Sequence, residues 1–204
     1  MKQGLVELFY KEVTGSAATD KRVGFLTEVA PILTEFPDDP LEPPSSGAVS
    51  LSIACGKNYY ESMAAAIGMF GDNHFVFGNV IKYLESPSSW FGDTPGIGHP
   101  VYKSVDPRAK KIKEIGDKYF STCYGLRVIE SEAERLGVCV NMAGALAPYL
   151  RVAGFEKHNA DSFPLMCRMI GLSKIYNNIK EGGGIKLQSS SNIFKEASKL
   201  CSKS

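Results

Sequence analysis

Apolar residues recur at intervals of three and four along most of this 204-residue chain. That spacing places them on one face of an α-helix, whereas a half-buried strand needs strict alternation, and no stretch alternates strictly enough to require a sheet. Five periodic segments are expected to be helical: residues 58–71, 106–120, 121–137, 140–155 and 161–181. The pattern therefore predicts an all-α protein.

Residues that favour helix ends flank several of these segments. Asn58 is followed three residues later by Glu61, which is typical of a capping box. Asp106 and Pro107 suit the N-cap and the first helical position of the next segment. Pro148 falls inside a strongly apolar segment and is expected to bend or end that helix.

Two segments are too rich in proline, glycine and serine to be helix interiors. Residues 35–47 and 85–100 are therefore predicted to be loops. Residues 183–204 change composition toward glycine, serine and lysine and are expected to form a flexible tail. The folded domain is expected to span residues 1–182.

The composition is that of a soluble globular protein, with 44% hydrophobic and 22% charged residues and a net charge of +1. That charge gives no reason to expect a nucleic-acid or membrane partner, and no apolar run is long enough for a signal peptide or a membrane span. The five cysteines are scattered without the spacing of a zinc site or a disulfide framework. We expect a reduced, cytoplasmic protein without a metal. The cysteines are Cys55, Cys123, Cys139, Cys167 and Cys201.

The three histidines have different settings. His158 lies among polar residues between two predicted helices and is expected to be a solvated loop residue. His74 opens an apolar segment, and in the first turn of a helix an imidazole is favoured in its neutral form. A neutral imidazole can polarise a carbonyl, or His74 can simply cap the helix; the sequence leaves both open. His99 lies between two glycines and a proline, directly before a helix start.

Two arginines are in unusual positions. Arg108 lies in the first turn of the helix predicted after His99, where the helix dipole is unfavourable for a cation. Arg168 is the only charged residue in an apolar stretch, and so is expected at the edge of the buried face or paired with an anion. Together with His74 and His99, these arginines are typical of a site for a small polycarboxylate, although surface arginines are common.

Five motifs follow one another along residues 25–182. They are PDDPLEPPSSGAV, IGMFGDNH, PGIGHPVYKSVDPRAKK, VNMAGALAPYLRVAGF and LMCRMIGLSKIYNNIKE. In this order they resemble the citrate synthase superfamily, closest to its short citryl-CoA lyase-like branch. The resemblance implies an all-helical fold, here truncated at the N-terminus, with a large part and a smaller CoA-binding part at roughly residues 90–155. It also implies a homodimer or a dimer of dimers.

The resemblance also implies roles for single residues. His74 would hydrogen-bond the thioester carbonyl of acetyl-CoA, and His99 would hold an oxygen of the four-carbon acid oxaloacetate. Arg108 and Arg168 would bind the carboxylates of that acid. Coenzyme A would be bound as a substrate, with Lys103 near its phosphates and the backbone amides of residues 94–98 near its adenine. The latter loop includes Thr94, Gly96, Ile97 and Gly98.

Some positions depart from the family pattern. Asn141 aligns with the aspartate that serves the family as general base, and an amide cannot accept that proton. Asp39 aligns with a substrate-binding histidine, and its carboxylate would repel a polycarboxylate. No arginine lies in the tail to match the one that a partner subunit normally contributes, unless Lys186 substitutes for it.

Two functions are therefore expected as alternatives. The first is a citryl-CoA lyase or citrate synthase-like enzyme that makes or cleaves the C–C bond between a short acyl-CoA and a 2-oxo acid, with either an altered substrate or a base from Asp38 or Asp39. The second is a catalytically degenerate homologue that binds a CoA ester or serves as a partner subunit. The retained histidines and arginines favour the first, and Asn141 and Asp39 favour the second.

Overall fold

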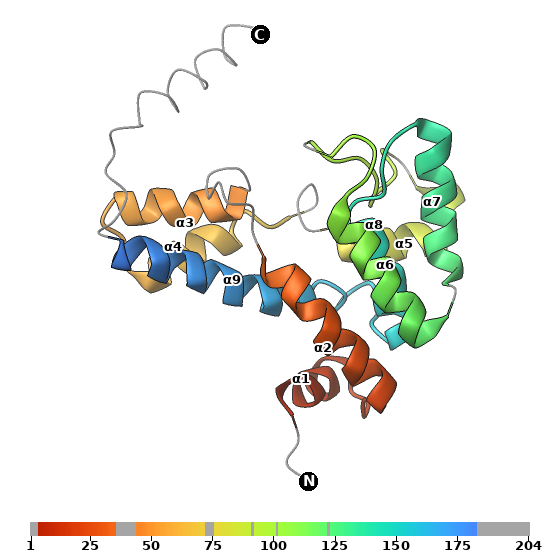
Figure 1. Cartoon of the computed structure of the whole chain (residues 1–204), viewed down its shortest axis with the longest axis horizontal. Coiled ribbons are helices and arrows are strands. Elements are labelled where there is room, and N and C mark those ends of the chain that lie inside the picture. Colours follow the sequence, from red (N-terminus) through yellow and green to blue (C-terminus); the bar gives the residue numbers. More distant parts are fainter. Residues whose placement is uncertain are drawn as a thin grey trace, which may run out of the picture. The chain divides into compact units, whose positions relative to one another are not determined.

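The computed structural model describes residues 4–35, 44–71, 76–90, 92–100, 102–121 and 123–182. Within these ranges all regular elements are helices (Figure 1), and an isolated β-bridge joins Ile97 and Val140. The helices are α1 (Leu5–Thr14), α2 (Asp20–Thr34), α3 (Pro44–Ala54), α4 (Tyr59–Ile67), α5 (Phe77–Glu85), η1 (a 3-10 turn, Pro87–Ser89), α6 (Pro107–Phe120), α7 (Tyr124–Leu136), α8 (Met142–Ala153) and α9 (Ser162–Glu181). The all-α prediction is confirmed.

The chain divides into two compact units. Unit 1 contains Met1–Glu35 and Phe70–Met169, and unit 2 contains Phe36–Met69 and Ile170–Ser204. Each unit thus combines segments that are distant in the sequence. The smaller part expected at roughly residues 90–155 lies inside unit 1 and stays a prediction, as does the flexible tail at 183–204, which is outside the described residues.

The predicted helix starts are present in the structure. The Asn58 side chain accepts a hydrogen bond from the Glu61 backbone N–H, and the Glu61 carboxylate accepts one from the Asn58 backbone, both at 3.0 Å. The Asp106 carboxylate accepts from the backbone N–H of Arg108 at 3.0 Å, with Pro107 as the first residue of α6. In each case the capping residue satisfies a backbone donor that the helix itself leaves unpaired.

Three expectations about helix boundaries need correction. Helices α1 and α2 were not predicted from the periodicity. The loop predicted at residues 35–47 is shorter, because α3 begins at Pro44; a proline fits the first turn, where no intrahelical N–H bond is required. Pro148 does not end its helix, since α8 continues to Ala153. Packing on neighbouring helices stabilises α8 despite the lost N–H bond.

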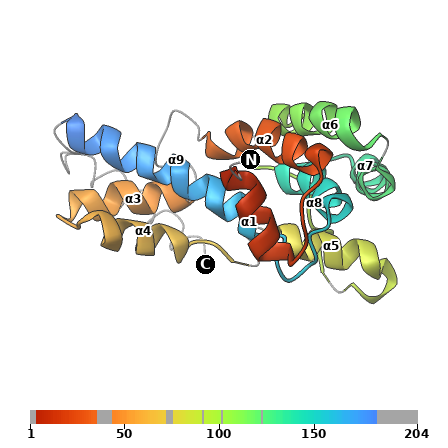
Figure 2. The same cartoon turned by 90° about the horizontal axis from the view of Figure 1, so that it is seen from below.

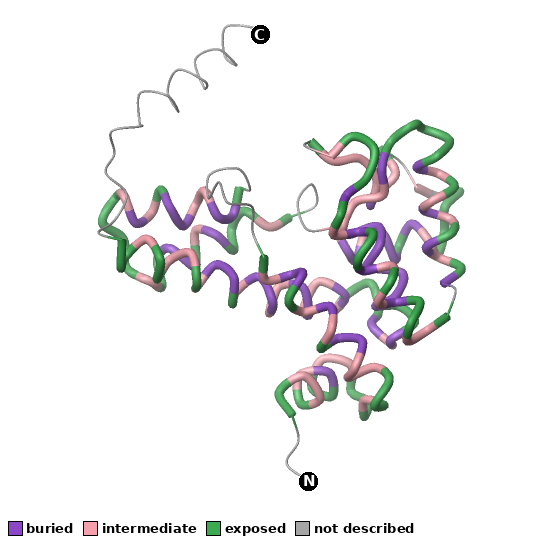
Figure 3. Tube along the Cα trace, viewed as in Figure 1, coloured by how far each residue is buried: buried purple, intermediate pink, exposed green. Residues whose placement is uncertain are grey.

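Helix α8 is the centre of unit 1. It packs against α5, α6 and α7, and α2 packs against α6 (Figure 2). The run from Ala143 to Leu150 is buried throughout, which fits the apolar character of this segment on all its faces. Along α6 and α7, by contrast, buried positions alternate with exposed ones (Figure 3), as expected of helices that pack on one side.

Close approach of helices α6 and α8 requires a glycine. A Cβ atom at Gly116 would lie 2.3 Å from Cζ of Tyr149, whose side chain is fully buried. The Tyr149 hydroxyl donates a hydrogen bond to the Asp117 carboxylate at 2.6 Å, so this ring is fixed by a hydrogen bond to α6 as well as by its burial. The contact therefore depends on the absence of a side chain at Gly116.

Unit 2 is built on α3, α4 and the later turns of α9. Helices α3 and α4 pack on each other, and the Tyr59 hydroxyl lies 2.7 Å from the Ser173 hydroxyl of α9. The ring of Tyr59 also makes an edge contact with Tyr176, with centroids 5.2 Å apart. Four buried serines on α3 and α4 have small side chains that favour close packing of these helices. They are Ser45, Ser46, Ser50 and Ser62.

None of the four cysteines in the described residues forms a disulfide. Cys55 is exposed, and Cys123, Cys139 and Cys167 are buried. Burial raises the pKa of the Cys167 thiol to about 12, so this side chain remains an uncharged part of the core at neutral pH. In the described part of the chain no helix is long and apolar enough to span a membrane.

We expect Gly116→Ala to destabilise unit 1. The added methyl group must displace either the buried Tyr149 ring or the α6 backbone, which costs roughly 1–3 kcal/mol. Gly68→Ala is a suitable control, because its Cβ would meet neighbouring atoms at an ordinary 3.5 Å and its φ is −62°. Thermal unfolding followed by circular dichroism measures both. Equal Tm values for the two variants would show that the helices can separate at no cost.

Candidate functional site

The loop that carries His99 is fastened to the start of α8 by backbone contacts. The Gly98 N–H donates to the Cys139 carbonyl at 2.7 Å, and the Asn141 N–H donates to the Gly96 carbonyl at 3.0 Å. Gly96 has φ +87°, and a Cβ on Gly144 would lie 2.0 Å from the Gly96 carbonyl oxygen. These two glycines therefore allow the loop to lie directly on the first turn of α8.

The Asn141 side chain completes this attachment in both directions. Its Oδ1 accepts from the backbone N–H groups of Ala143 and Gly144, at 2.9 and 3.1 Å, and so caps α8. Its Nδ2 donates to the carbonyls of Ile97 and Gly98, at 3.3 and 3.0 Å. An amide is required for this pattern, because a carboxylate has no hydrogen with which to meet the two carbonyl oxygens.

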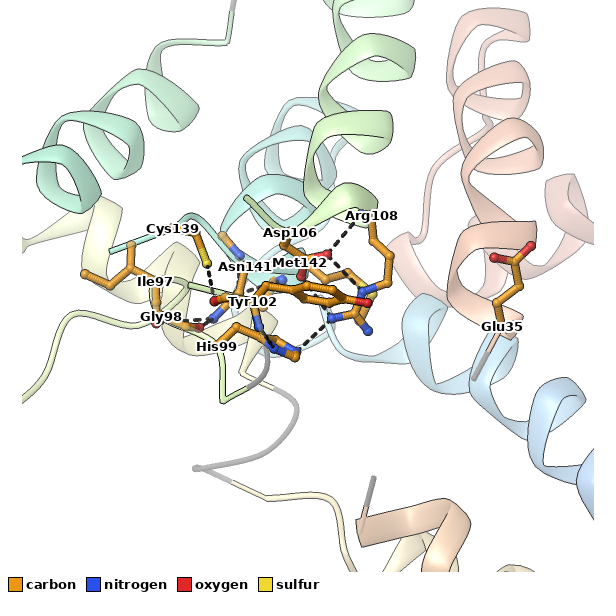
Figure 4. Close-up of polar contacts among 12 residues, drawn as sticks. Glu35, Ile97, Gly98, His99, Tyr102, Asp106, Arg108, Cys139, Asn141 and Met142 are labelled. Atoms are coloured by element: carbon orange, nitrogen blue, oxygen red, sulfur yellow. Dashed lines mark hydrogen bonds and ion pairs between the residues drawn. The ribbon is translucent and has the colours of Figure 1, made fainter. Parts of the chain in front are cut away.

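His99 lies between two N–H donors. Its Nδ1 accepts from the Tyr102 backbone N–H at 3.2 Å, and its Nε2 lies 2.9 Å from Nη2 of Arg108 (Figure 4). A neutral imidazole has only one nitrogen lone pair in the ring plane, so in either tautomer one of these donors points at a ring N–H. A ligand oxygen between His99 and Arg108 would accept from both and remove the conflict.

Arg108 is held by the residue that caps its own helix. The Asp106 carboxylate accepts from Arg108 Nε at 3.0 Å and from Nη2 at 2.9 Å. Tyr102 contacts both His99 and Arg108. The centroid of its ring lies 4.7 Å from the centroid of the His99 ring and 5.5 Å from Cζ of Arg108. Figure 4 shows His99, Tyr102 and Arg108 gathered together, with Asp106 and Asn141 beside them.

Arg168, on the part of α9 that belongs to unit 1, is close to this group. It is 8% exposed, and its guanidinium donates to the Glu35 carbonyl at 2.8 Å and lies 3.8 Å from the sulfur of Met142. Burial, and after it the positive charge of Arg108, lower the pKa of the Arg168 guanidinium to about 10. An anion bound beside both arginines would raise this pKa again, because its negative charge stabilises the protonated guanidinium.

The charges of the described site favour an anionic ligand. Arg108 and Arg168 contribute two positive charges, and Asp106 contributes one negative charge that its three contacts with Arg108 already use. Arg108 is only partly exposed and Arg168 is buried, so a ligand here would meet cations that water screens weakly. The arrangement can bind carboxylates and hydrogen-bond a neighbouring oxygen.

The other predicted site residues are placed as follows. His74 and Asp39 lie outside the described residues, and the described part of α5 begins at Phe77. Lys103 is exposed in the turn before α6, and the Thr94 hydroxyl donates to Glu132 on α7 at 3.3 Å. Gly96, Ile97 and Gly98 form the attachment to α8, so the Gly98 amide is already engaged. Their predicted contacts with coenzyme A stay predictions.

Sequence reasoning missed two members of this group. Tyr102 was not singled out, although its position between His99 and the helix start is a usable signal. Asp106 was recognised only as a helix cap, whereas the spacing D-x-R also allows its carboxylate to reach the guanidinium two residues later. Among the described residues, no three histidine, cysteine, aspartate or glutamate side chains are grouped as metal ligands would be.

We expect Asn141→Asp to destabilise the attachment of the His99 loop. The carboxylate can still cap α8, but it loses two donors and faces two carbonyl oxygens, which costs about 1–3 kcal/mol. Asn58→Asp is the matched control, since the described contacts of that N-cap side chain use only its oxygen; it should change stability by less than about 0.5 kcal/mol. Thermal unfolding and amide hydrogen exchange at Gly98 measure the difference. Equal stability of both variants would contradict this role of the amide.

Comparison with known proteins gives a consistent answer about the fold. No family model matches the sequence. The structure resembles citryl-CoA lyase from Hydrogenobacter thermophilus, with a TM-score of 0.72 and 20% identity over 85% of this chain and 75% of that one. It also resembles ATP citrate lyase from Methanothrix soehngenii, solved in complex with citrate and coenzyme A, with a TM-score of 0.72 and 16% identity over 90% of this chain and 35% of that one.

Citrate synthase from Pyrobaculum aerophilum is a third similar structure, with a TM-score of 0.67 and 19% identity over 87% of this chain and 50% of that one. The chain thus spans three-quarters of the lyase but only half or less of the two larger proteins. At these identities the likeness concerns the fold. The protein has the citrate synthase-like helical fold, as the resemblance of its sequence motifs implied.

Proposed function

We propose that the protein binds a small polycarboxylate at His99, Arg108 and Arg168 and acts on it as a citryl-CoA lyase or citrate synthase-type enzyme. It would make or cleave the C–C bond between a short acyl-CoA, such as acetyl-CoA, and a 2-oxo acid such as oxaloacetate. The observation that carries the proposal is the 2.9 Å contact between Nη2 of Arg108 and Nε2 of His99, beside a buried second arginine: when the imidazole carries its proton on Nε2, a ligand oxygen can accept from both groups.

The two arginines would bind the carboxylates of the acid. A guanidinium offers parallel N–H donors that match the two oxygens of a carboxylate, and this match is stronger where water is excluded. Arg168 is more buried than Arg108, so an anion beside it would gain more from electrostatics in a weakly polar environment. Two arginines on separate helices suit an acid with at least two carboxylates.

His99 would act on the oxygen at which charge develops. In the synthetic direction a base removes a proton from the acyl methyl group, the resulting enol forms the C–C bond to the keto carbon, and the keto oxygen becomes a hydroxyl. Cleavage is the reverse of this step. In the synthetic direction, release of the coenzyme A thiol requires a further step, in which water hydrolyses the thioester of the citryl-CoA product. An imidazole N–H and a guanidinium N–H that converge on this oxygen would stabilise its negative charge in the transition state.

Coenzyme A is proposed as the carrier of the acyl group. The similar ATP citrate lyase was solved with citrate and coenzyme A together, which supports a paired site for the two ligands. Gly98 has φ +74° and open space where a Cβ would stand, so a ligand can approach the backbone there. Lys103 is exposed and suited to the phosphates, and His74 is proposed for the thioester carbonyl. A homodimer, or a dimer of dimers, is proposed from the sequence resemblance, and a cytoplasmic location is proposed from the scattered cysteines.

The second candidate is a catalytically degenerate homologue that binds a CoA ester or serves as a partner subunit. One observation favours it specifically. By the sequence resemblance Asn141 takes the place of the family's aspartate, and all four described hydrogen bonds of its side chain are to backbone groups. Such a side chain cannot accept a proton from a substrate. An active enzyme would need another base, and Asp38 and Asp39 are the proposed sources.

We expect the wild-type protein to bind citrate, and Arg108→Gln and Arg168→Gln each to weaken that binding by about 10- to 100-fold, the effect of one lost charge-assisted contact. Arg127→Gln on α7 removes the same charge from an exposed position and should leave the affinity unchanged. Isothermal titration calorimetry at constant salt measures all four proteins. Citrate binding that is absent, or equally weakened by Arg127→Gln, would contradict the proposed acid site.

We expect thiol release from acetyl-CoA plus oxaloacetate, or oxaloacetate formation from citryl-CoA, and at least a 100-fold loss in His99→Ala, as is typical when a group that stabilises the developing oxyanion is removed. Lack of turnover in both directions, with citrate and coenzyme A still bound, would favour the degenerate homologue. Asn141→Asp then gives a second test. Gain of turnover would identify position 141 as that of the missing base, whereas unchanged inactivity would argue against that alignment.

A further inference from the structure

Asp106 is unusual among the charged residues of unit 1 because its side chain is completely buried. Burial of a carboxylate is costly unless its oxygens are hydrogen-bonded. Here Oδ1 accepts from the backbone N–H and from Nε of Arg108, both at 3.0 Å, and Oδ2 accepts from Nη2 at 2.9 Å. Arg108 is thus the donor in every described contact of this carboxylate.

These contacts determine which edge of the guanidinium is available to a ligand. Nε and one hydrogen of Nη2 are used by Asp106, and the other hydrogen of Nη2 points toward His99. No contact within the described residues uses Nη1. An incoming oxygen would therefore meet Nη1 and the Nη2–His99 junction, at the end of the guanidinium opposite to Asp106.

Without Asp106, little in the described structure would hold Arg108 in this orientation. An arginine side chain has several rotatable bonds, and fixing them costs conformational entropy. The first turn of α6 repels a cation, so it favours rotamers that point away from the helix start. The Tyr102 ring at 5.5 Å contacts one face of the guanidinium but does not fix its rotation in that plane.

We propose that Asp106 is a positioning residue for the acid site: its buried carboxylate binds Arg108 side-on and thereby aims the free edge of the guanidinium at the ligand oxygen shared with His99. This inference rests on the proposed function for the identity of the ligand. The side-on pairing itself is independent of any ligand. Asp106 has a second, separable task as the N-cap of α6.

Positioning and simple electrostatics predict opposite effects of removing this carboxylate. Asp106 is a negative charge beside a site for an anion, so neutralising it should strengthen citrate binding if charge alone matters. If positioning matters, neutralising it should weaken binding, because Arg108 must then be ordered when the ligand arrives. The direction of the change decides between the two.

The variants are Asp106→Asn and Asp106→Ser. Both residues are good N-caps, so the start of α6 is preserved, but neither provides the two acceptor oxygens. In the asparagine variant an amide N–H₂ would face Nη2, donor against donor. We expect citrate binding to weaken by about tenfold in both variants, measured by titration calorimetry. Glu114→Gln, an exposed glutamate on the same helix, is the control for lost charge and should leave the affinity unchanged or slightly increased.

Arg108→Lys separates positioning from general damage to the fold. A lysine keeps the charge but cannot be bound side-on by a carboxylate. In this background Asp106→Asn should have no further effect on citrate affinity, or should increase it. Equal losses in the two backgrounds would overturn the positioning role, as would unchanged or tighter citrate binding in Asp106→Asn alone.

A ligand-free measurement tests the pairing even if citrate does not bind. In the wild-type protein labelled with nitrogen-15, the Nε–H resonance of Arg108 should exchange slowly with water, and in Asp106→Asn it should exchange at least tenfold faster, because its acceptor has been changed. Arg127, which is exposed, provides the fast-exchange reference within the same spectrum. Fast exchange at Arg108 in the wild type would overturn the inference. Slow exchange without citrate binding would instead contradict the proposed function alone.

Discussion

The hydrogen bonds of the Asn141 side chain hold the candidate site together. One amide group caps α8, the most buried helix of unit 1, and at the same time fixes the backbone of the loop that leads to His99. The position of His99 therefore follows from the core itself. Because the loop also lies on Gly144 without space for a side chain, its attachment depends on both hydrogen bonding and close packing.

This attachment restricts the chemistry that position 141 can perform. Both polar atoms of the amide are engaged with backbone groups, so the side chain is a structural element and not a proton acceptor. The side of the site that is proposed to bind an acid is formed by other residues. His99 lies on the loop, Arg108 on α6 and Arg168 on α9, and Nη2 of Arg108 lies 2.9 Å from Nε2 of His99. Structural support at position 141 thus coexists with the proposed acid site.

The cost of placing Arg108 at a helix start is offset by its neighbour. Asp106 caps the helix, neutralises part of the guanidinium charge and orients the free edge, all through one buried carboxylate. Arg168 is placed differently: it is buried and donates a hydrogen bond to the backbone carbonyl of Glu35, and burial, followed by the charge of Arg108, lowers its pKa. The two arginines are therefore complementary: one is fixed by a charge and the other by its surroundings.

The sequence by itself determined the helical class, several helix starts and the nearness of His99 and Arg108, because these depend on periodicity and on local hydrogen bonds over a few residues. It also indicated the citrate synthase-like fold through the order of its motifs. It did not predict α1 and α2, nor the continuation of α8 past Pro148, since those depend on packing between distant segments. Only the tertiary structure decided that the Asn141 amide binds the backbone of residues 97 and 98 and that Arg168 is buried near Arg108, because both contacts join segments more than forty residues apart.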